Sequence, residues 1–366
     1  MRVLLSGYYG FGNLGDEALA EVIAAQLRAR FPDAQLDVLS ADPDATARAL
    51  HVASTPRMDM GRVRDAIGRA DVVLSGGGGL LQNATSLRSL LYYAGIVRSA
   101  IKAGKRTMIF AQSVGPLDFW GRTIVREWCK GTERATVRDG RSRSLLESLL
   151  PGTRVEQTAD PVFLYDAPEE DVDLSAEGIG PDSDPLVIVS VRKAVGMKDG
   201  LDVLAEAVDR LSAMHHARVA FLPLGGVSDA EVSTSVIRKC RSAPVLLPES
   251  TLARAANLIR RSKAVVGMRL HALILAARYG VPFLAIPYDP KVSSLCEDLA
   301  YPIPPLFTPG TTRPPASAVN DAIDRFWSER EALSSHLWAA SDRLRSLAAR
   351  NFEVLGEVLG EKPKSP

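Results

Sequence analysis

Short apolar runs alternate with amphipathic segments along the whole chain. In the first half, the apolar runs predict strands at 2–6, 35–39, 71–75, 106–111, 134–138 and 154–158. Helical patterns lie between these runs, and the clearest covers 16–30, where Leu19, Val22, Ile23 and Leu27 recur at helical spacing. This alternation is typical of βαβ units built on a parallel sheet.

The second half repeats the scheme, with a helix after each strand. Strands are expected near 186–191, 218–223, 243–247, 263–267 and 282–286. The segment 165–185 carries eight acidic residues and no Lys or Arg, which favours a solvated linker. A Pro-rich loop at 302–315 precedes a long helical pattern at about 318–358, which could cross back onto the first domain. We therefore expect doubly wound α/β domains at 1–165 and 186–317, a linker at 166–185, and a C-terminal helix and tail at 318–366.

Composition fits two ordinary globular domains and excludes several classes of protein. The 366 residues include 44 Lys+Arg and 43 Asp+Glu, giving a net charge of +1. Because so balanced a chain cannot replace counterions along a phosphate backbone, we expect no nucleic-acid partner. The three cysteines form no CxxC pair, and no His, Cys or Asp cluster has metal-ligand spacing, so we expect neither disulfide nor metal. No uncharged apolar run of about 20 residues occurs, and we expect a cytoplasmic protein.

Ligands of open parallel sheets bind beyond the carboxyl ends of the strands, so the turns there are the candidate sites. The first turn, Gly7–Asp16, holds four glycines and is expected to leave backbone amides open to a ligand. Its Gly-x-Gly-x-x-Gly at 10–15 is a weak dinucleotide signal, because Asp16 would repel a pyrophosphate. We favour a polar acceptor bound by Asn13 and Asp16. The alternative makes Asp16 only a helix N-cap.

Three further turns lie at the same edge of the first domain. Ser75–Gln82 contains four consecutive glycines, which predict either a ligand-binding loop or a tight packing turn; the candidates there are Gly77, Gly78 and Gln82. Gln112 follows the next strand. Arg138 follows the strand at 134–137 and could direct its planar guanidinium at a carboxylate or phosphate. A surface pair between Arg138 and Asp139 is the alternative.

The most informative turns lie in the second domain. Arg269 and His271 follow the strand at 263–267, and Lys291 follows the strand at 282–286. If these strands are neighbours, about 4.8 Å apart, His271 and Lys291 lie at helix starts within reach of one ligand. Cations at helix N-termini oppose the helix dipole, and a bound anion would relieve that conflict. Arg192, after the strand at 186–191, adds a further cation at this edge. The alternative for His271 is an ordinary surface or packed histidine with no ligand.

Several catalytic motifs are missing from the sequence. No GxxxxGK[ST] and no GxSxG occur, and no clear ribose-binding acid follows the strand at 35–39 except Asp42. Nicotinamide chemistry is therefore not expected.

The segments GYYGFGNLGDEA, SGGGGLLQ, AQSVGP, TVRD and MRLHALILAARYGVPFLAIPYDPKV resemble, in this order, the polysaccharide pyruvyltransferase family. They are closest to its bacterial cell-surface-anchoring type, over about residues 1–300. The resemblance implies a GT-B-like fold, with two Rossmann-like domains facing across a cleft. It also implies transfer of pyruvate from phosphoenolpyruvate to two hydroxyls of a hexose, giving a cyclic ketal and phosphate, with no other cofactor. The implied acceptor is N-acetylmannosamine in a lipid-linked cell-wall polysaccharide precursor, at the inner face of the membrane, and the product binds S-layer homology domains.

The resemblance also assigns roles to individual residues. It implies that His271 is the general acid/base, that Lys291 binds phosphate and that Arg138, with Arg269, clamps the anions; Arg192 could supply the same charge as Arg138. The implied substrate-binding residues are Arg269, Arg192, Tyr288, Asn13, Asp16, Gly77, Gly78, Gln82 and Gln112. A nucleotide-sugar-dependent GT-B glycosyltransferase, with Glu249 holding a ribose, remains an alternative, as does a non-catalytic carbohydrate-binding protein. The exact hexose, the ketal position and the oligomeric state stay open.

Overall fold

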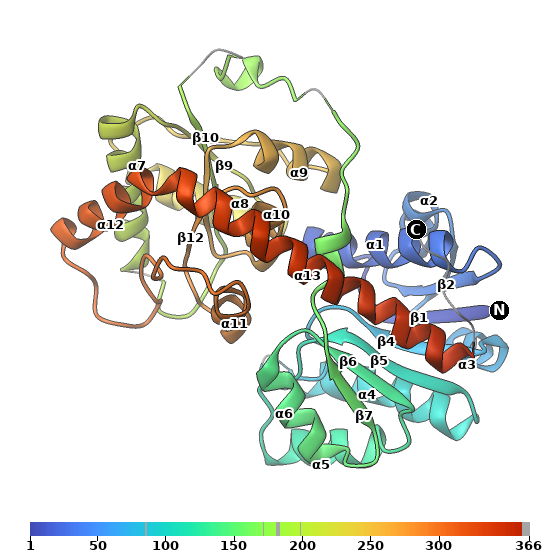
Figure 1. Ribbon diagram of the computed structural model, residues 1–366. Helices are drawn as coiled ribbons and strands as arrows, with labels where there is room; N and C mark the ends of the chain where they lie inside the picture. The colour runs from blue at the N-terminus through green and yellow to red at the C-terminus, as the bar shows by residue number, and fades with distance from the viewer. Residues whose placement is uncertain (85, 171, 181–183, 198, 361–366) are drawn as a thin grey trace. The chain divides into compact units, whose positions relative to one another are not determined.

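The computed structural model describes residues 1–84, 86–170, 172–180, 184–197 and 199–360. The chain divides into two compact units. Unit 1 comprises Met1–Tyr165 and the chain from Leu344 onward, and unit 2 comprises Asp166–Arg343. Each unit is built on its own parallel sheet (Figure 1).

Unit 1 contains a seven-stranded sheet in the order β3-β2-β1-β4-β5-β6-β7, and every neighbouring pair is parallel. The strands are β1 (Arg2–Tyr9), β2 (Gln35–Ser40), β3 (Ala53–Pro56), β4 (Val72–Gly76), β5 (Arg106–Gln112), β6 (Arg134–Val137) and β7 (Arg154–Gln157). The helices are α1 (Leu14–Arg30), α2 (Pro43–Leu50), α3 (Met60–Arg69), α4 (Leu87–Lys102), α5 (Phe119–Trp128), α6 (Gly140–Leu149) and the 3-10 turn Pro161–Leu164.

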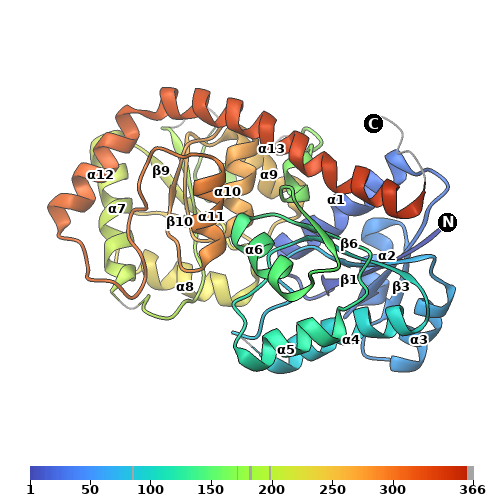
Figure 2. The same cartoon turned by 60° about the horizontal axis from the view of Figure 1, so that its bottom comes forward.

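Alternation along the strands divides the core of unit 1 between the two faces of its sheet. Val3 and Leu5 of β1 pack with α1 and with Phe352 and Leu355 of the last helix. Leu4, between them, packs on the other face with α3 and α4. α5 and α6 extend that second layer beyond β5, and Figure 2 shows α3, α4 and α5 along the lower edge of the unit. Both faces are covered, as a parallel sheet requires.

Unit 2 contains a five-stranded parallel sheet in the order β10-β9-β8-β11-β12. Its strands are β8 (Leu186–Ser190), β9 (Arg218–Phe221), β10 (Val245–Leu246), β11 (Ala264–Gly267) and β12 (Phe283–Ala285). Its helices are α7 (Gly200–His215), α8 (Val227–Ile237), α9 (Leu252–Arg261), α10 (Leu270–Arg278), α11 (Pro290–Asp298), α12 (Ala316–Ser328) and the 3-10 turn Ser175–Glu177. Val187 and Val189 pack with α7 and α12, while α9 and α10 contact the sheet at β8, β11 and β12.

The structure differs from the expected organisation in three respects. β3 was not expected, because its sequence ASTP is short and contains no large apolar residue. The helical pattern at 318–358 is two helices, α12 and α13 (Arg330–Leu359), which Glu329 separates. α13 contributes Leu333 to the core of unit 2 and Phe352 to that of unit 1, so 318–366 is not a separate part of the chain.

The expected acidic linker at 166–185 belongs to unit 2. Its first residues are held by α9 and α10: Arg260 pairs with Glu169 at 2.6 Å, and the Ala167 amide donates to the Tyr279 hydroxyl at 3.2 Å. The repulsion among the acidic side chains suggested a solvated linker. The ion pair and the hydrogen bond to Tyr279 oppose that repulsion and attach the segment to unit 2. Residues 171 and 181–183 of this segment, and 361–366 of the expected tail, lie outside the described residues.

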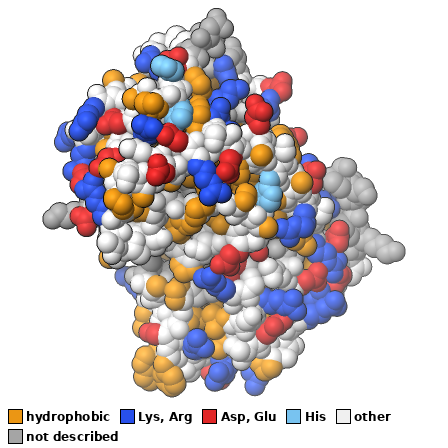
Figure 3. All heavy atoms as spheres, turned by 60° about the vertical axis from the view of Figure 1, so that its left-hand side comes forward, with side chains coloured by type: hydrophobic (Ala, Val, Ile, Leu, Met, Phe, Trp, Pro, Cys, Tyr) orange, Lys and Arg blue, Asp and Glu red, His pale blue; other side chains and the backbone are white. Residues whose placement is uncertain are grey.

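Charge and apolar character on the described surface follow the composition. On the face shown in Figure 3, Lys and Arg side chains alternate with Asp and Glu, so that face carries no field of a single sign. Within the described residues, no helix combines the length and the apolar character needed to cross a bilayer. The same residues contain no group of three His, Cys, Asp or Glu side chains placed to hold a metal ion.

The order of the strands identifies the ligand-binding edge of each unit. In unit 1 the chain order reverses between β1 and β4, and in unit 2 between β8 and β11. Parallel sheets bind ligands beyond the carboxyl ends of the strands at such reversal points. The candidate turns are therefore those after β1 and β4 in unit 1, and those after β8, β11 and β12 in unit 2.

Candidate functional site

The carboxyl edge of unit 2 gathers its predicted residues on three neighbouring strands. β11 pairs with β8 on one side and with β12 on the other, both in parallel. The neighbouring arrangement of β11 and β12, which the prediction for His271 and Lys291 required, is thus confirmed. Both side chains lie in the first turns of their helices, α10 and α11, and both are half-buried.

Arg192 and Tyr288 contact each other at this edge. Arg192 follows β8, Tyr288 follows β12, and β11 lies between these two strands. The Arg192 Nη1 donates to the Tyr288 hydroxyl at 2.9 Å, and its guanidinium carbon lies 4.8 Å from the centre of the Tyr288 ring. The pair thus joins the two turns that flank the start of α10.

Burial raises the pKa of the Tyr288 hydroxyl, and the positive charge of Arg192 opposes that rise in part. Tyr288 is therefore a neutral phenol at pH 7. While its oxygen accepts from Arg192, its O–H can donate to a bound oxygen. The Arg192 Nε is buried and has no hydrogen-bond partner among the residues that the structure describes. The pair accordingly offers donors, which suit an anion.

Arg269 is held by an ion pair within unit 2, and its expected contact with a bound anion stays a prediction. Its Nε and Nη2 donate to the two carboxylate oxygens of Asp229 at 2.6 and 2.5 Å. Asp229 lies in the first turn of α8 and is fully buried. A side chain at Gly225 would clash with the Arg269 guanidinium, so this glycine makes room for it. Arg269 therefore joins the end of β11 to the start of α8, and its charge is already balanced.

The sequence suggested that the glycine-rich turn after β1 leaves its amides open to a ligand, and the structure shows two of these amides engaged within the chain. The Glu17 carboxylate accepts from the Gly10 amide at 2.9 Å and from the Phe11 amide at 3.2 Å. Burial raises the pKa of Glu17, although hydrogen bonds from the turn act in the opposite direction. The turn therefore carries a negative charge inside it, which disfavours a phosphate.

Asn13 and Asp16 lie together at the start of α1. Asn13, not Asp16, is the N-cap residue, and its side-chain amide donates to the Asp16 carboxylate. Both side chains are half-buried. Gln82 is half-buried as well. Carboxylate and amide groups of this kind hydrogen-bond neutral hydroxyls, and their role in ligand binding stays a prediction.

Gly77, Gly78 and Gln112 have packing roles in the structure, and the expectation that they also hold a ligand stays a prediction. Gly77 and Gly78 are buried and left-handed, with φ of +77° and +69°. A Cβ on Gly78 would lie 2.8 Å from the Asp16 Oδ1, so this glycine lets α1 approach β4. Gln112 has no exposed surface, and its Nε2 donates to the Ser75 carbonyl at 2.6 Å.

Arg138 is likewise engaged inside unit 1. Its guanidinium forms an ion pair with Asp160, and its Nε donates to the Ser113 hydroxyl at 2.8 Å. The Arg138 side chain is 7% exposed and that of Asp160 4%. Asp139, the expected surface partner, instead caps α6 by accepting from the Ser142 amide. Arg138 therefore stabilises the turn after β6, and the choice between Arg138 and Arg192 as the arginine that binds a ligand stays open.

The sequence reasoning did not name Glu17 and Asp229, two carboxylates that contact the predicted site residues and turns. Glu17 accepts hydrogen bonds from the turn amides and Asp229 accepts them from Arg269, and these donors were expected to bind a ligand. A signal for Asp229 exists in the sequence GGVSDAE after the strand at 218–221, which starts a helix with an acidic residue after two glycines. Glu17 follows Asp16 in the first turn of α1, and no pattern in the sequence distinguishes it from an ordinary exposed glutamate.

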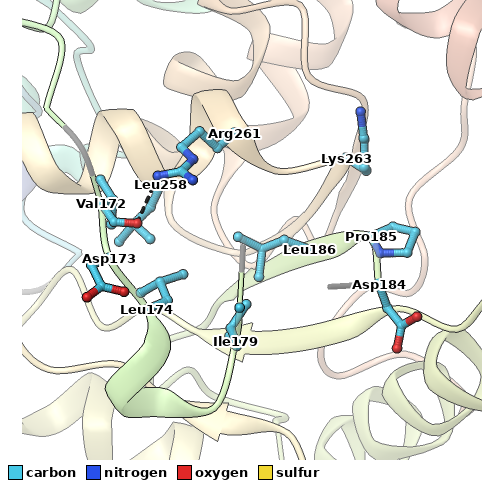
Figure 4. A pocket seen from close by; sticks show the side chains of 11 residues that line it. Val172, Asp173, Leu174, Ile179, Asp184, Pro185, Leu186, Leu258, Arg261 and Lys263 are labelled. Carbon is cyan, nitrogen blue, oxygen red and sulfur yellow. Dashed lines mark hydrogen bonds between the residues drawn. The ribbon is translucent and has the colours of Figure 1, made fainter. Parts of the chain in front are cut away.

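A cavity of about 370 Å³ lies at the opposite edge of the unit 2 sheet. Leu186 at the start of β8, Lys263 before β11 and Arg261 at the end of α9 line it, as Figure 4 shows. The Arg261 Nη1 donates there to the Val172 carbonyl at 2.8 Å. Because this is the amino edge of the sheet, the cavity is separate from the candidate site.

The sequence matches the family described as polysaccharide pyruvyl transferase over residues 13–290, about three quarters of the chain. The chain belongs to this family. The match includes Arg138, Arg192 and His271 and ends one residue before Lys291. No curated protein matches the sequence of this polysaccharide pyruvyl transferase family member.

Solved structures of nucleotide-sugar enzymes share the fold. A Listeria monocytogenes protein described as a UDP-N-acetylglucosamine 2-epimerase has a TM-score of 0.68 and 10% identity, over 100% of this chain and 98% of that one. The Anabaena protein HepE in complex with UDP-glucose has a TM-score of 0.64 and 12% identity, over 98% and 100% of the two chains. The Neisseria meningitidis UDP-GlcNAc 2-epimerase bound to UDP-GlcNAc has a TM-score of 0.62 and 10% identity, again over 98% and 100%. At such identities the likeness confirms the expected GT-B-like fold with two Rossmann-like units, and the cleft between them stays a prediction.

Proposed function

We propose that this member of the polysaccharide pyruvyl transferase family transfers pyruvate from phosphoenolpyruvate to two hydroxyls of a hexose. The product is a cyclic ketal, and phosphate is released. We propose N-acetylmannosamine, in a cell-wall polysaccharide or its lipid-linked precursor, as the acceptor of an enzyme of the cell-surface-anchoring type. The single observation that best supports this proposal is the order β8-β11-β12, which brings the turns of Arg192, His271 and Lys291 to one edge.

Unit 2 is the proposed donor side. Phosphoenolpyruvate carries a carboxylate and a phosphate, and its pocket needs donors and cations that do not themselves react. Arg192 with Tyr288 supplies one set of donors, and Lys291, in the first turn of α11, supplies a second positive charge. Arg269 takes a positioning role here, because Asp229 holds its guanidinium at the start of α10.

The proposed chemistry uses His271 as general acid and then as general base. The imidazolium of His271 gives a proton to the methylene carbon of phosphoenolpyruvate, which leaves C2 electron-poor. A sugar hydroxyl then adds to C2, and its proton returns to the imidazole. A second hydroxyl forms the other C2–O bond as the C2–O bond to phosphate breaks, and its proton leaves with phosphate. A positioned acid of this kind accelerates such a step about 10²–10⁴-fold.

Unit 1 is the proposed acceptor side. Asn13, Asp16 and Gln82 lie at its carboxyl edge and are half-buried. The negative charges of Asp16 and Glu17 suit a neutral sugar better than an anionic donor, because they would repel phosphate.

Mass spectrometry tests the reaction directly. A synthetic N-acetylmannosamine glycolipid, incubated with enzyme and phosphoenolpyruvate, should gain one pyruvylidene group. We expect His271→Ala and Lys291→Ala to lose at least about 100-fold in rate, as for loss of a general acid. Lys263→Ala removes an exposed lysine at the amino edge of the same sheet and should leave the rate unchanged. Near-full phosphate release by His271→Ala or Lys291→Ala would contradict the assigned roles.

A nucleotide-sugar-dependent glycosyltransferase is the second candidate. It is favoured by the solved structures of this fold that contain UDP-glucose or UDP-GlcNAc. Ligand binding to the folded state raises the unfolding temperature. Stabilisation by UDP or GDP and not by phosphoenolpyruvate would favour this candidate, and the opposite result the pyruvyl transfer.

We further propose that unit 1 contacts an anionic membrane surface through the start of α5. Phe119 and Trp120 are 73% and 66% exposed there. Asn83 contacts Asp118 and Gly95 lies by Trp128, so α4 and α5 run side by side in the same direction. This places the exposed Leu87 and Leu91 level with the first turns of α5.

Exposed arginines border these apolar side chains, namely Arg88, Arg122 and Arg126. Exposed aromatic side chains with neighbouring cations suit an anionic lipid interface. Sedimentation with vesicles containing phosphatidylglycerol tests this. The wild type should sediment with the vesicles, and a Phe119→Ser, Trp120→Ser variant should not. Equal sedimentation of the two proteins would contradict the lipid contact. So would a wild type that self-associates without vesicles and a variant that does not, because the exposed side chains would then contact a second copy of the chain.

A further inference from the structure

Two exposed aromatic rings lie against each other at the carboxyl end of β1. Tyr8 is the next-to-last residue of the strand and Phe11 lies in the turn that follows. They are 40% and 46% exposed, and their rings stack with centres 4.1 Å apart and planes 13° apart. Rings this exposed are free to rotate unless something holds them.

Arg57 holds Phe11 from within unit 1. Its guanidinium carbon lies 4.9 Å from the centre of the Phe11 ring and 4.3 Å from that of Tyr92. Its Nη1 donates to the Tyr93 hydroxyl at 3.1 Å, and the residue is only 8% exposed. Among the described residues no carboxylate forms an ion pair with it, so the aromatic rings are its main electrostatic partners.

These contacts join three groups into a column, in which the nearly buried Arg57 lies by the Phe11 ring and Phe11 stacks on the exposed Tyr8. Tyr8 covers one face of Phe11, and the guanidinium lies over the ring without contacting Tyr8. The Phe11 amide is fixed as well, by its bond to Glu17 at 3.2 Å. The outer face of Tyr8 is thus a pre-ordered flat apolar surface, which costs little entropy to use in binding.

The polar groups beside the column decide which flat ligand suits it. Asp16, Glu17 and Asn13 lie in the same turn and its helix, and they offer carboxylate and amide groups. A nucleotide could stack on Tyr8, but these carboxylates would repel its phosphates. A hexose has an apolar face of C–H groups and a rim of neutral hydroxyls. Its C–H groups suit the negative face of an aromatic ring, and its hydroxyls suit the carboxylates.

We propose that the Tyr8–Phe11–Arg57 column is a binding platform for one hexose ring. The ring lies on the outer face of Tyr8 with hydroxyls directed to Asn13 and Asp16. This inference rests on the proposed function only for the choice of a saccharide as ligand. The column itself follows from the contacts within unit 1.

Saturation-transfer NMR without phosphoenolpyruvate tests the platform separately from the reaction. The probes are the methyl glycosides of glucose, galactose, mannose and N-acetylmannosamine, with uridine monophosphate for comparison. We expect the wild type to bind at least one glycoside and not the nucleotide. Tyr8→Ala should weaken that binding about threefold to tenfold, the worth of one aromatic contact. Tyr8→Phe keeps the ring and should restore it. Met60→Ala removes another exposed apolar side chain of the same unit and should change nothing.

Each outcome decides for or against the platform. Absence of binding to every glycoside, or equal binding by Tyr8→Ala and wild type, would overturn it, as would preferred binding of the nucleotide to the Tyr8 surface. Loss of glycoside binding in Tyr8→Ala, with no pyruvyl transfer by the wild type, would support the platform and refute the proposed reaction. Unchanged binding in Tyr8→Ala, with active transfer by the wild type, would do the reverse.

Discussion

The buried pair of Arg269 and Asp229 should be essential for the stability of unit 2. Both donor–acceptor distances are short, 2.6 and 2.5 Å, and the Asp229 side chain is 1% exposed against 14% for Arg269. Asp229→Asn keeps the size of the side chain and removes its charge. The Arg269 cation then remains in a mostly desolvated place without a balancing charge.

Removal of one partner of such a pair costs about 3–5 kcal/mol of unfolding free energy. For a unit of this size that cost lowers the unfolding temperature by roughly 6–20 °C. Differential scanning calorimetry should therefore show the transition of unit 2 moving down while that of unit 1 stays in place. Arg325→Gln is the matched control, because the Arg325–Glu329 pair is 63% and 39% exposed and exposed pairs contribute about 1 kcal/mol or less.

A double variant separates the unpaired charge from other causes of instability. Asp229→Leu combined with Arg269→Met replaces both charges by apolar groups, and we expect it to recover most of the loss. A cost of less than about 1 kcal/mol for Asp229→Asn would refute this reasoning. A double variant no more stable than Asp229→Asn would refute it too.

Two predictions concern the turns of unit 1. Gly78→Ala should destabilise the protein more than Gly104→Ala, because only at Gly78 would the added Cβ meet Asp16. Both glycines have a φ of +69°, so both variants share a backbone strain of about 1–2 kcal/mol. Equal urea midpoints of the two variants would contradict the close approach of Asp16 to Gly78. Glu17→Gln should stabilise the protein at pH 7. Burial raises the pKa of Glu17, so the protonated side chain favours the folded state, and this stabilisation is lost as the pH rises through the raised pKa. The glutamine side chain of the variant stays neutral and avoids that loss. The gain should disappear below pH 4.5, the ordinary value, where both side chains are neutral, and a gain independent of pH in thermal unfolding would contradict the argument.

The regular elements were largely predictable, because they depend on local periodicity. β1, β2, β8 and β11 coincide with apolar runs, and only β3, whose sequence contains no large apolar residue, was missed entirely. The edge carrying His271 and Lys291 was also predictable, since parallel βα units direct their turns to one side. The order of the strands was not, because it depends on contacts between distant segments.

The ion-pair partners of the predicted site residues could not be predicted from the sequence. Arg138 and Arg269 were read as open cations, but Asp160 lies 22 residues from the first and Asp229 lies 40 residues from the second. Nothing local in the sequence specifies such pairs, which only folding brings together. Arg192 and Tyr288 are 96 residues apart in the sequence, so their hydrogen bond could not be predicted either. This contact supports the predicted site, because both residues were candidates for it.

Helix α13 makes the completion of unit 1 depend on a segment that is synthesised long after its last strand, β7. Phe352, Leu355 and Val358 of α13 belong to the core formed by α1, β1 and β5, and Phe110 contacts Phe352 with ring centres 5.2 Å apart. A ribosome adding about 5–20 residues per second needs roughly 10–40 s to proceed from the end of β7 to these residues. During that interval an apolar face of the first sheet stays open to solvent and to chaperones.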